Sequence, residues 1–382
     1  MTVKEKFLSQ VLNQDVKDVS IAEKKIGPNH PCFVIAEAGV NHNGDIDLAE
    51  KLVYAAAKAG VDAVKFQTFK AEQVTTKKSP TAAYQKANVG KDNQWELLRP
   101  LELKESAYPR LIKACDQAGI MFLSTPHGHI ESARLLNPMV QAWKVGSGDL
   151  TNLPFLEYLG KTGKPVILST GMANIEEIRE AINIIESTEN KDLIILQCTT
   201  NYPCPDEEAN VSAMLDIQRN FPEYPIGFSD HTMGVEAPVI AAVLGATMIE
   251  KHFTLDRNMD GPDQKNSLEP QELKQMIERI KKVQGMTQEN REKLLQDMSR
   301  ARALFGTGVK KPFQSELVIA DMARKAVIAE TDIKAGTLIT EKMLTIKRPA
   351  KNGLHPKIYW KIIGKKAKRD IKADTQLKKD DF

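Results

Sequence analysis

The sequence has few cysteines and lacks long apolar runs. No stretch of about 18 apolar residues occurs, which predicts that no segment spans a membrane. The first twenty residues lack the apolar centre of a signal peptide, which predicts that the protein is not secreted. The cysteines form no C-x-x-C pair, so we expect reduced thiols in the cytoplasm rather than disulfides or a zinc site. There are only four, namely Cys32, Cys115, Cys198 and Cys204.

Net charge is also small, at +3, but it is unevenly distributed. From Arg324 to the C-terminus 16 basic residues face 7 acidic ones, a local charge of +9. A basic segment can be a solvated face, a nucleic-acid site or a site for an anionic ligand. The basic residues are not interleaved with aromatic ones and no recognition motif is present. We therefore expect no nucleic-acid partner, and the other two interpretations stay open.

Residues 31–284 alternate between strand-like and helix-like segments. Segments such as 47–60 and 173–187 have apolar residues three and four apart, which predicts helices. Eight nearly continuous apolar runs lie between such segments, as expected for strands covered on both faces. Eight strand–helix units over about 250 residues predict a (β/α)8 TIM barrel, a fold of the α/β class. The runs are 31–39, 62–69, 120–126, 142–149, 165–172, 193–200, 225–232 and 247–254.

The rest of the chain predicts three smaller parts. Residues 1–30 form an N-terminal extension, expected as a helix or hairpin at the bottom of the barrel. Residues 285–323 are polar and predict a linker with some helix. Residues 324–382 have short strands and glycine turns, which predict a small, mostly-β domain. About sixty residues rarely form an independent core, so we expect this domain to pack against another surface.

Polar side chains gather at the ends of the eight apolar runs. TIM barrels carry their active sites at the C-terminal ends of their strands, so this clustering predicts one catalytic site. The residues concerned are Glu37, Lys65, Gln67, Thr125, Lys144, Ser147, Ser169, Thr200, His231 and His252.

Two histidines at the ends of the last two runs could share a metal ion. His231 and His252 would lie on neighbouring strands about 5 Å apart. Two protein ligands leave coordination positions for water or substrate, which is typical of a catalytic metal. The alternative is that the histidines are structural and hydrogen-bonded by Asp230 or Glu250. His127 and His129 form a competing H-x-H pair, although we expect a loop pair of this kind to face solvent.

Lysines within apolar strands indicate an anionic ligand. Lys65 and Lys144 would be costly there unless each ammonium met an anion or reached the strand mouth. Together with Ser147, Ser169 and the neighbouring glycine turns they predict a phosphate cradle. The rival chemistry is a Schiff-base aldolase with one of these lysines as the nucleophile. The carboxylates that could activate water or orient hydroxyl groups are Glu37, Asp149 and Asp263.

These motifs together resemble those of the sialic acid synthase family. The matching strings, in order, are FVIAEAGVNHNGD, AVKFQTF, FLSTP, KVGSGD, ILSTGM, CTTNYP, FSDHT, EKHFTLDR and GPD. The tail strings KAVIAETDIKAGTLITEKMLTIKRP and IIGKKAKRDI resemble the family's antifreeze-like (SAF) domain. The resemblance runs from about residue 31 to the C-terminus. It is specific, because nine motifs and the tail occur in order.

The resemblance implies roles for individual residues. Glu37, Asp149 and Lys144 would be catalytic, and His231 and His252 would bind a divalent metal, typically Mn²⁺, with Mg²⁺ or Co²⁺ as alternatives. Sugar contacts would come from Gln67, Tyr202, Asp263 and Arg348, the last reaching into the partner subunit of a domain-swapped homodimer. Phosphoenolpyruvate would be held by Lys65, Thr125, Lys144, Ser147, Ser169 and Gly171.

The implied reaction is the condensation of phosphoenolpyruvate with an open-chain N-acyl hexose, such as N-acetylmannosamine, and water. It releases phosphate without a covalent enzyme intermediate, so the lysines would act as charge clamps. The resemblance implies an N-acetylneuraminate or legionaminate synthase acting on an unphosphorylated sugar. Residues 353–356, GLHP, are similar to pseudaminate synthases, which are the alternative. A non-catalytic barrel that binds through its antifreeze-like tail is a third interpretation, which the intact histidines and lysines disfavour. Gln264 departs from the histidine common in the family, which leaves the sugar open.

Overall fold

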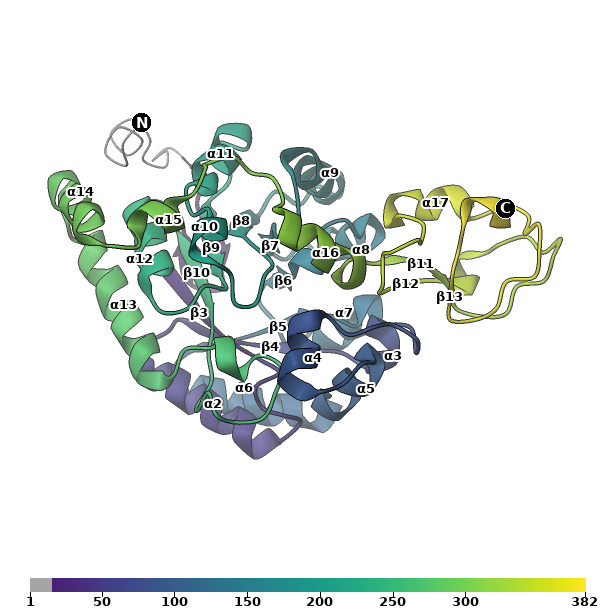
Figure 1. Ribbon diagram of the computed structural model, residues 1–382, viewed down its shortest axis with the longest axis horizontal. Helices are drawn as coiled ribbons and strands as arrows, with labels where there is room; N and C mark the ends of the chain where they lie inside the picture. Colours follow the sequence, from purple (N-terminus) through teal and green to yellow (C-terminus); the bar gives the residue numbers. More distant parts are fainter. Residues whose placement is uncertain (1–15) are drawn as a thin grey trace.

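A computed structural model describes residues 16–382, apart from the side chains of residues 83 and 84. Eight parallel strands form its centre, in the order β5-β4-β3-β10-β9-β8-β7-β6. β5 and β6, at the two ends of this order, pack against each other, so the sheet is a nearly closed barrel (Figure 1). The predicted TIM barrel is confirmed. The strands are β3 (Phe33–Gly39), β4 (Ala63–Thr68), β5 (Met121–Pro126), β6 (Trp143–Val145), β7 (Val166–Ser169), β8 (Leu193–Cys198), β9 (Ile226–Asp230) and β10 (Met248–His252).

A ring of helices covers the outside of the barrel. Their ends follow the local sequence: the Asp45 carboxylate accepts two backbone N–H groups at the start of α2, and Gly60 ends that helix at φ 96°. Asn174 and Glu177 form a capping box at the start of α9. The ring consists of α2 (Ile46–Ala59), α6 (Tyr108–Ala118), α7 (His129–Leu136), α8 (Leu153–Gly160), α9 (Ile175–Glu186), α11 (Ala213–Asn220), α12 (Glu236–Val243) and α13 (Pro270–Gln284).

Shorter elements decorate the loops beyond the C-terminal ends of the strands. Between β4 and α6 the chain forms α3 (Ala71–Val74), α4 (Ala83–Val89) and α5 (Gln94–Leu98). A 3-10 turn, η3 (Ser147–Asp149), follows β6, and α10 (Asp206–Ala209) follows β8. No helix within residues 16–382 is both long enough and apolar enough to cross a membrane.

The opposite end of the barrel is closed by a hairpin of β1 (Val19–Ile21) and β2 (Lys24–Ile26). Val19, Ile21 and Ile26 are buried against side chains that fill the barrel interior, including Ile35 and Leu123. Of the two structures considered for the N-terminal extension, the described part is therefore the hairpin. Residues 1–15 lie outside the described part of the chain.

The segment predicted as a linker is largely helical and packs on the barrel. It contains α14 (Gln288–Asp297), α15 (Ala301–Phe305) and α16 (Gln314–Ala323). Leu295, Leu304 and Phe305 belong to the main hydrophobic core. The longest stretch outside helices, residues 306–313, leads to α16, which lines the cavity at the strand ends.

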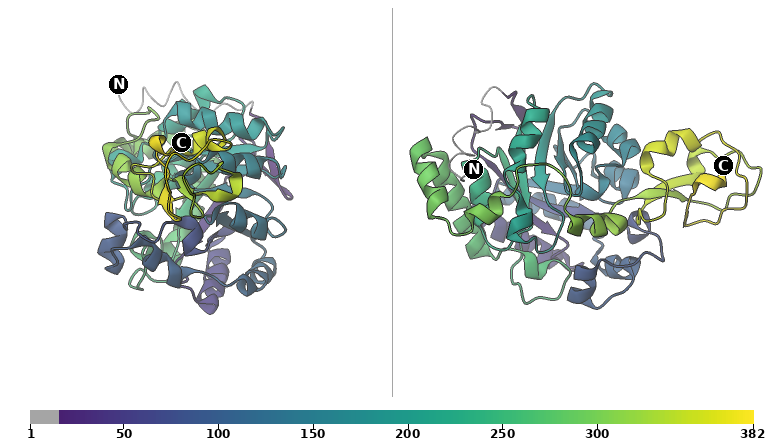
Figure 2. Two further views of the ribbon diagram at one scale, coloured as in Figure 1. Left: turned by 90° about the vertical axis from the view of Figure 1, so that its right-hand side faces the viewer. Right: turned by 45° about the horizontal axis from the view of Figure 1, so that its top comes forward.

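The tail domain projects from one side of the barrel (Figures 1 and 2). Its antiparallel sheet consists of β11 (Ala326–Ala329), β12 (Leu344–Lys347) and β13 (Thr375–Gln376), with α17 (Tyr359–Ile362) nearby. It has a small hydrophobic core of its own. A buried ion pair between Lys325 and Asp149 and the backbone around Arg348 attach it to the barrel.

Candidate active site

A cavity of about 1110 Å³, including its open mouth, lies at the C-terminal ends of the barrel strands. The sequence analysis placed the site at this end, and twelve of the fourteen residues that it assigned line the cavity. They are Glu37, Lys65, Gln67, Thr125, Lys144, Ser147, Ser169, Tyr202, His231, His252, Asp263 and Arg348.

One part of the cavity floor is organised around Lys65 on β4. Its ammonium lies 2.7 Å from the Glu37 carboxylate and donates to Thr125 Oγ1 at 3.0 Å. Glu37 also accepts a hydrogen bond of 3.1 Å from the Gln67 amide. β3, β4 and β5 are consecutive in the sheet, so their parallel register brings these four side chains together.

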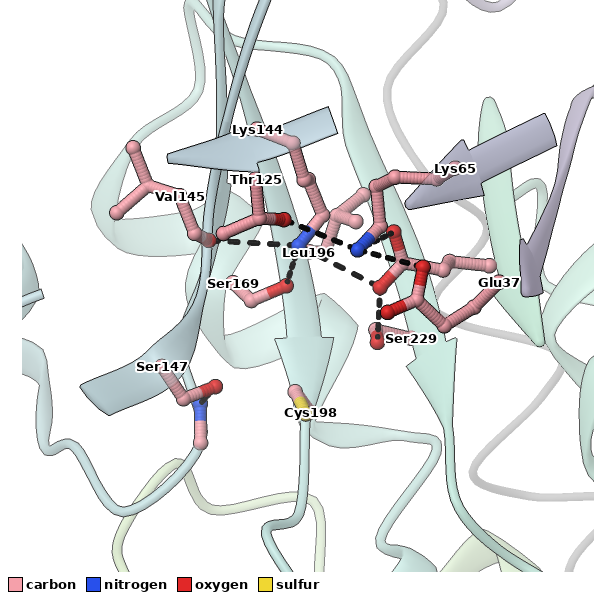
Figure 3. A network of polar contacts seen from close by, with 12 residues as sticks. Glu37, Lys65, Thr125, Lys144, Val145, Ser147, Ser169, Leu196, Cys198 and Ser229 are labelled. Carbon is pink, nitrogen blue, oxygen red and sulfur yellow. Dashed lines mark hydrogen bonds and ion pairs between the residues drawn. The ribbon is translucent and has the colours of Figure 1, made fainter. Parts of the chain in front are cut away.

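The other part is organised around Lys144 on β6. Its ammonium donates to Ser169 Oγ at 2.7 Å and lies 3.4 Å from Glu250 Oε1, which accepts from Ser229 at 3.0 Å (Figure 3). Sequence reasoning did not assign Glu250 or Ser229 to the site. Both lie two residues before a predicted metal ligand, and strand side chains alternate between faces, so that spacing was the available signal.

The two lysines and two glutamates shift one another's pKa values. Burial would raise the pKa of Glu250, but Lys144 and Lys65 outweigh it and lower the value to about 2. Burial raises the pKa of Glu37, whereas it lowers that of Lys144. Glu250 and Glu37 together outweigh burial at Lys65 and raise its pKa. The floor thus holds ammonium groups whose partners could be replaced by the charges of an anionic ligand.

His231 and His252 lie side by side at the cavity, with ring centroids 5.4 Å apart. The Nδ1–H of His231 donates to the Thr199 carbonyl at 2.7 Å, which leaves Nε2 as the nitrogen with a lone pair. His252 Nδ1 is buried and has no hydrogen-bond partner in the described part of the chain. Burial and His231 hold the pKa of His252 well below its usual range, so this imidazole is neutral. Burial would lower the pKa of His231, but the neighbouring Cys198 outweighs it and raises the value. His252 therefore offers a free nitrogen to a metal, and His231 offers Nε2 in its neutral form.

A buried ion pair outside the barrel wall supports the two histidines. Lys251 donates to Asp230 and to the Thr232 carbonyl, which connects the residues directly beside each histidine. Within residues 16–382 no group of three or more His, Cys, Asp or Glu side chains is arranged to hold a metal ion. If the two histidines were structural, Asp230 was expected to hydrogen-bond one of them. The Asp230 carboxylate instead accepts from Lys251 and Thr232.

Asp263 and Tyr202 lie on the histidine side of the cavity. The Tyr202 ring is 4.1 Å from that of His231, and the two rings are tilted. Asp263 is buried, and burial followed by the charge of Glu37 raises its pKa to about 6. A carboxyl group of this kind can exchange a proton near neutral pH.

Two assigned residues do not line the cavity. The Gly171 N–H donates to Ser147 Oγ at 2.9 Å and so supports Ser147. Its role in binding phosphoenolpyruvate stays a prediction. Asp149 was expected to be catalytic, beside the phosphate. It is fully buried and pairs with Lys325 at 2.8 Å, while Asn152 donates to its carboxylate. Asp149 thus joins the barrel to the tail domain, and its catalytic role stays a prediction.

His127 and His129 were expected to face solvent as an H-x-H pair, and this was wrong. His129 is buried against the Phe155 ring, and burial lowers its pKa to about 3. His127 lines the cavity, 3.9 Å from the Asp149 carboxylate. α7 begins at His129, whereas His127 precedes the helix, so the two side chains lie in different environments.

Arg348 lines an active-site cavity, as expected. In the described chain this cavity belongs to the same chain and not to a partner subunit. Its backbone N–H donates to Val74 at 2.9 Å, and its carbonyl accepts from Thr76 at 3.0 Å. These bonds form a short parallel bridge between Thr75 and Arg348. The expectation that Arg348 serves a partner's barrel therefore differs from the described structure, in which α16 and Lys325 bring the tail domain to its own barrel.

The upper walls of the cavity were also missed. One is formed by the β4–α6 loop and contains Gln85, Gln94 and several apolar residues; the other comes from α16, through Ile319, Met322 and Ala323. These residues lie far from the strand ends in the sequence, so only the folded loops bring them to the site. Residues 84–86, which include Gln85, resemble legionaminate and neuraminate synthases, but that resemblance did not assign Gln85 to the site.

Comparison with known proteins identifies the family. Residues 52–292 match the NeuB family model, and residues 324–382 match the SAF domain model. The chain belongs to the NeuB family. The N,N'-diacetyllegionaminic acid synthase of Campylobacter jejuni is 42% identical over 91% of this chain and 98% of that protein. The human N-acetylneuraminate-9-phosphate synthase is 32% identical over 92% of this chain and 93% of its own length.

A solved NeuB-like structure shares the arrangement. The spore coat polysaccharide biosynthesis protein SpsE of Bacillus subtilis superposes with a TM-score of 0.81 at 35% identity, covering 96% of this chain and 99% of that one. The resemblance noted from the motifs is thereby confirmed. The chain is an enzyme of the sialic acid synthase type with a C-terminal SAF domain.

Proposed function

We propose that this NeuB-family enzyme condenses phosphoenolpyruvate with the open-chain form of an unphosphorylated N-acyl hexose to make a nonulosonate of the legionaminate or neuraminate type. The observation that carries the proposal is the pair of buried ammonium groups, Lys65 and Lys144, beside two imidazoles in one cavity. The Campylobacter jejuni legionaminic acid synthase, at 42% identity, supports the choice of product.

Phosphoenolpyruvate would lie over the lysines. Its phosphate and carboxylate charges would pair with Lys65 and Lys144, while Ser147, Ser169 and Thr125 donate hydroxyl hydrogen bonds. Glu37 and Glu250 balance the lysines before the ligand binds. Both ammonium groups are already engaged by carboxylates and hydroxyls, which favours a clamp over a Schiff-base nucleophile.

The reaction forms two new bonds to the atoms of phosphoenolpyruvate: one from its C3 to the aldehyde carbon of the sugar, and one from its C2 to the oxygen of water. C3 of phosphoenolpyruvate bonds to the sugar aldehyde carbon, whose oxygen takes up a proton. Water adds to C2 with loss of one proton, which balances the proton taken up by the aldehyde oxygen. The C2–O bond to phosphate then breaks as the new hydroxyl gives up its proton to become the C2 carbonyl, and the phosphate takes up that proton. Asp263, with a pKa of about 6, and Glu37, whose pKa burial raises, are the groups placed to exchange these protons.

His231 and His252 would hold a divalent metal, most simply Mn²⁺. Such a metal would polarise the aldehyde carbonyl as a Lewis acid. The unpartnered Nδ1 of His252 and the single free nitrogen of His231 are the features that fit it.

We also propose a homodimer in which the tail domains are exchanged. Val309, Leu317 and Val318, on the segment between barrel and tail, are exposed to 50%, 45% and 60%. Apolar side chains so exposed beside a site entrance suit a subunit interface. In a dimer with exchanged tail domains, Lys325 would still contact Asp149 and Arg348 would still bond to Val74 and Thr76. The tail and the barrel in these contacts would then come from different chains.

Phosphate release tests the proposed function. The protein, with phosphoenolpyruvate, Mn²⁺ and a panel of N-acyl hexoses, should release phosphate and form a nonulosonate detectable by mass spectrometry. Lys144→Met should lose this activity, whereas Lys161→Met, which removes an exposed lysine paired with Glu157, should keep it. The panel includes the precursor of pseudaminate, so turnover of that sugar alone would favour the alternative product. No phosphate from any sugar would overturn the enzyme proposal.

A further inference from the structure

A buried carboxylate on α16 connects the segment before the tail domain to the strand ends of the barrel. Glu316, in the first turn of α16, is only 1% exposed. Its Oε1 accepts the Met172 N–H at 2.7 Å and the Thr200 N–H at 2.8 Å. Its Oε2 accepts the N–H of Phe313, just before its own helix, at 3.0 Å. One side chain thus holds the loops that follow β7 and β8 against α16.

Met172 has a backbone conformation that needs this support. Its φ is 63°, in the left-handed region that residues with a side chain seldom adopt, and it is buried. Its N–H bonds to Glu316, and its carbonyl accepts from Arg324, the residue directly after α16, at 2.9 Å. Arg324 is itself held by the Glu177 carboxylate at 2.7 Å. Both polar backbone groups of Met172 are therefore bonded by residues at the two ends of α16.

The turn at Met172 supports the part of the cavity proposed to bind phosphate. Ser169 and Gly171 come shortly before it, and the Gly171 N–H donates to Ser147 Oγ at 2.9 Å. A Cβ at Gly171 would lie 2.0 Å from Thr200 Oγ1 and 2.7 Å from Ser147 Oγ, so the loops after β6, β7 and β8 are in close contact here. A shift of the Met172 turn would therefore displace Gly171 and, with it, Ser147.

We infer that Glu316 is a positioning residue for phosphoenolpyruvate. It is not among the residues that line the cavity, so it acts through Met172 and Thr200 on the hydroxyl groups of Ser147 and Ser169. Donors that are already fixed bind an anion more tightly than donors that must first be ordered, because less conformational entropy is lost on binding. The inference rests on the proposed function and adds to the same site a residue outside its lining.

The test compares two replacements of Glu316. Glu316→Leu removes the acceptor for Met172 and Thr200, whereas Glu316→Gln keeps one oxygen that can accept from both. For Glu316→Leu we expect the KM for phosphoenolpyruvate, measured by phosphate release, to rise at least about tenfold, while the KM for the sugar changes less than about twofold. Glu316→Gln should bring the KM for phosphoenolpyruvate back to within about threefold of the wild-type value. Asp321→Leu replaces the other carboxylate of α16, an exposed one that pairs with Lys351 at 3.5 Å, and should leave both KM values unchanged.

Calorimetric binding of phosphoenolpyruvate without sugar provides a readout independent of turnover. Glu316→Leu should bind it at least about tenfold more weakly than the wild type. Arg324→Met removes the bond to the Met172 carbonyl from the other end of α16, so it should also weaken binding. Thermal unfolding shows which variants are folded, and Arg324→Met decides if the leucine variant is not.

A merely structural role predicts a different pattern. A loss of kcat with unchanged KM and unchanged binding of phosphoenolpyruvate in the folded variants would overturn the inference, while phosphate release would still support the reaction. If no sugar gives phosphate, the reaction proposal fails, and the binding of phosphoenolpyruvate alone decides the role of Glu316. A wild type that does not bind phosphoenolpyruvate would overturn both.

Discussion

Lys325 Nζ lies 2.8 Å from Asp149 Oδ1, in an ion pair whose side chains are 0% and 1% exposed. Lys325 is next to the first strand of the tail domain, and Asp149 follows β6 of the barrel. Lys325 also donates to the His127 carbonyl at 3.1 Å. The pair therefore fixes the tail domain beside the cavity that Arg348 lines.

Asp149→Asn should destabilise this junction. The change leaves the Lys325 ammonium buried without its counter-charge, at a cost of about 3–5 kcal/mol. The pKa of Asp149 is lowered in the folded state, because Lys325 and His127 outweigh burial. Its stabilising contribution is therefore present above the unfolded pKa and lost as the pH falls through the folded value. Thermal unfolding from pH 7 downward should show the wild type converging on the variant.

Asp192→Asn is the matched control for the junction. Asp192 pairs with Lys17 at 3.5 Å, but the two side chains are 44% and 73% exposed. Exposed pairs contribute about 0–1 kcal/mol, so this change should barely alter the unfolding temperature. If the two variants were equally stable, the Lys325–Asp149 pair would not hold the junction. The Asp149 variant should also raise the KM for the sugar, since Arg348 loses its position.

Removal of the metal should abolish turnover, and Mn²⁺ should restore it after EDTA treatment. His231→Ala removes one of two ligands, so we expect Mn²⁺ affinity, measured by calorimetry or electron paramagnetic resonance, to fall by at least about 100-fold. His30→Ala, on the hairpin side and paired with Asp18, is the control that should bind as the wild type does. Unchanged Mn²⁺ binding by the His231 variant would rule out this site.

Asp263 should reduce the stability of the metal-free protein at neutral pH. Its pKa rises from 3.8 to about 6 on folding, so the folded state resists ionisation. For an acid with a raised folded pKa, stability falls as the pH rises between these two values. The difference corresponds to about 3 kcal/mol above pH 6. In EDTA, Asp263→Asn should gain most of this stability at pH 7.5 and none at pH 3.5, although it should be less active. Equal stabilisation at both values would contradict the burial argument.

Much of the fold and the site floor could be predicted from the sequence, for a physical reason. Strands covered on both faces are continuous apolar runs, so a residue such as Lys144 or His252 at the end of a run stands out. The same pattern could not locate Gln94 or Lys325. Gln94 reaches the cavity through a loop, and Lys325 reaches Asp149 from a second domain, so both positions depend on tertiary packing. Asp149 is an example of what the sequence could not predict. The KVGSGD motif that contains it lies next to the site, but its ion-pair partner, Lys325, lies in the tail domain.

Mixing two defective chains tests whether the tail domain serves its own barrel or that of a partner. In Arg348→Ala the barrel keeps His231, and in His231→Ala the tail keeps Arg348. If tails are exchanged in a homodimer, as we propose, a mixed dimer contains one barrel with His231 covered by a tail with Arg348. Activity should then recover partly when the two chains are mixed and allowed to exchange subunits.

If each tail stays on its own barrel, as within the described chain, every site lacks one of the two residues and mixing recovers nothing. Mixing either variant with itself is the control for reassembly. The second outcome would show that the tail domains are not exchanged and that Arg348 bonds to Val74 of its own chain. The chemistry proposed for the barrel would be unaffected.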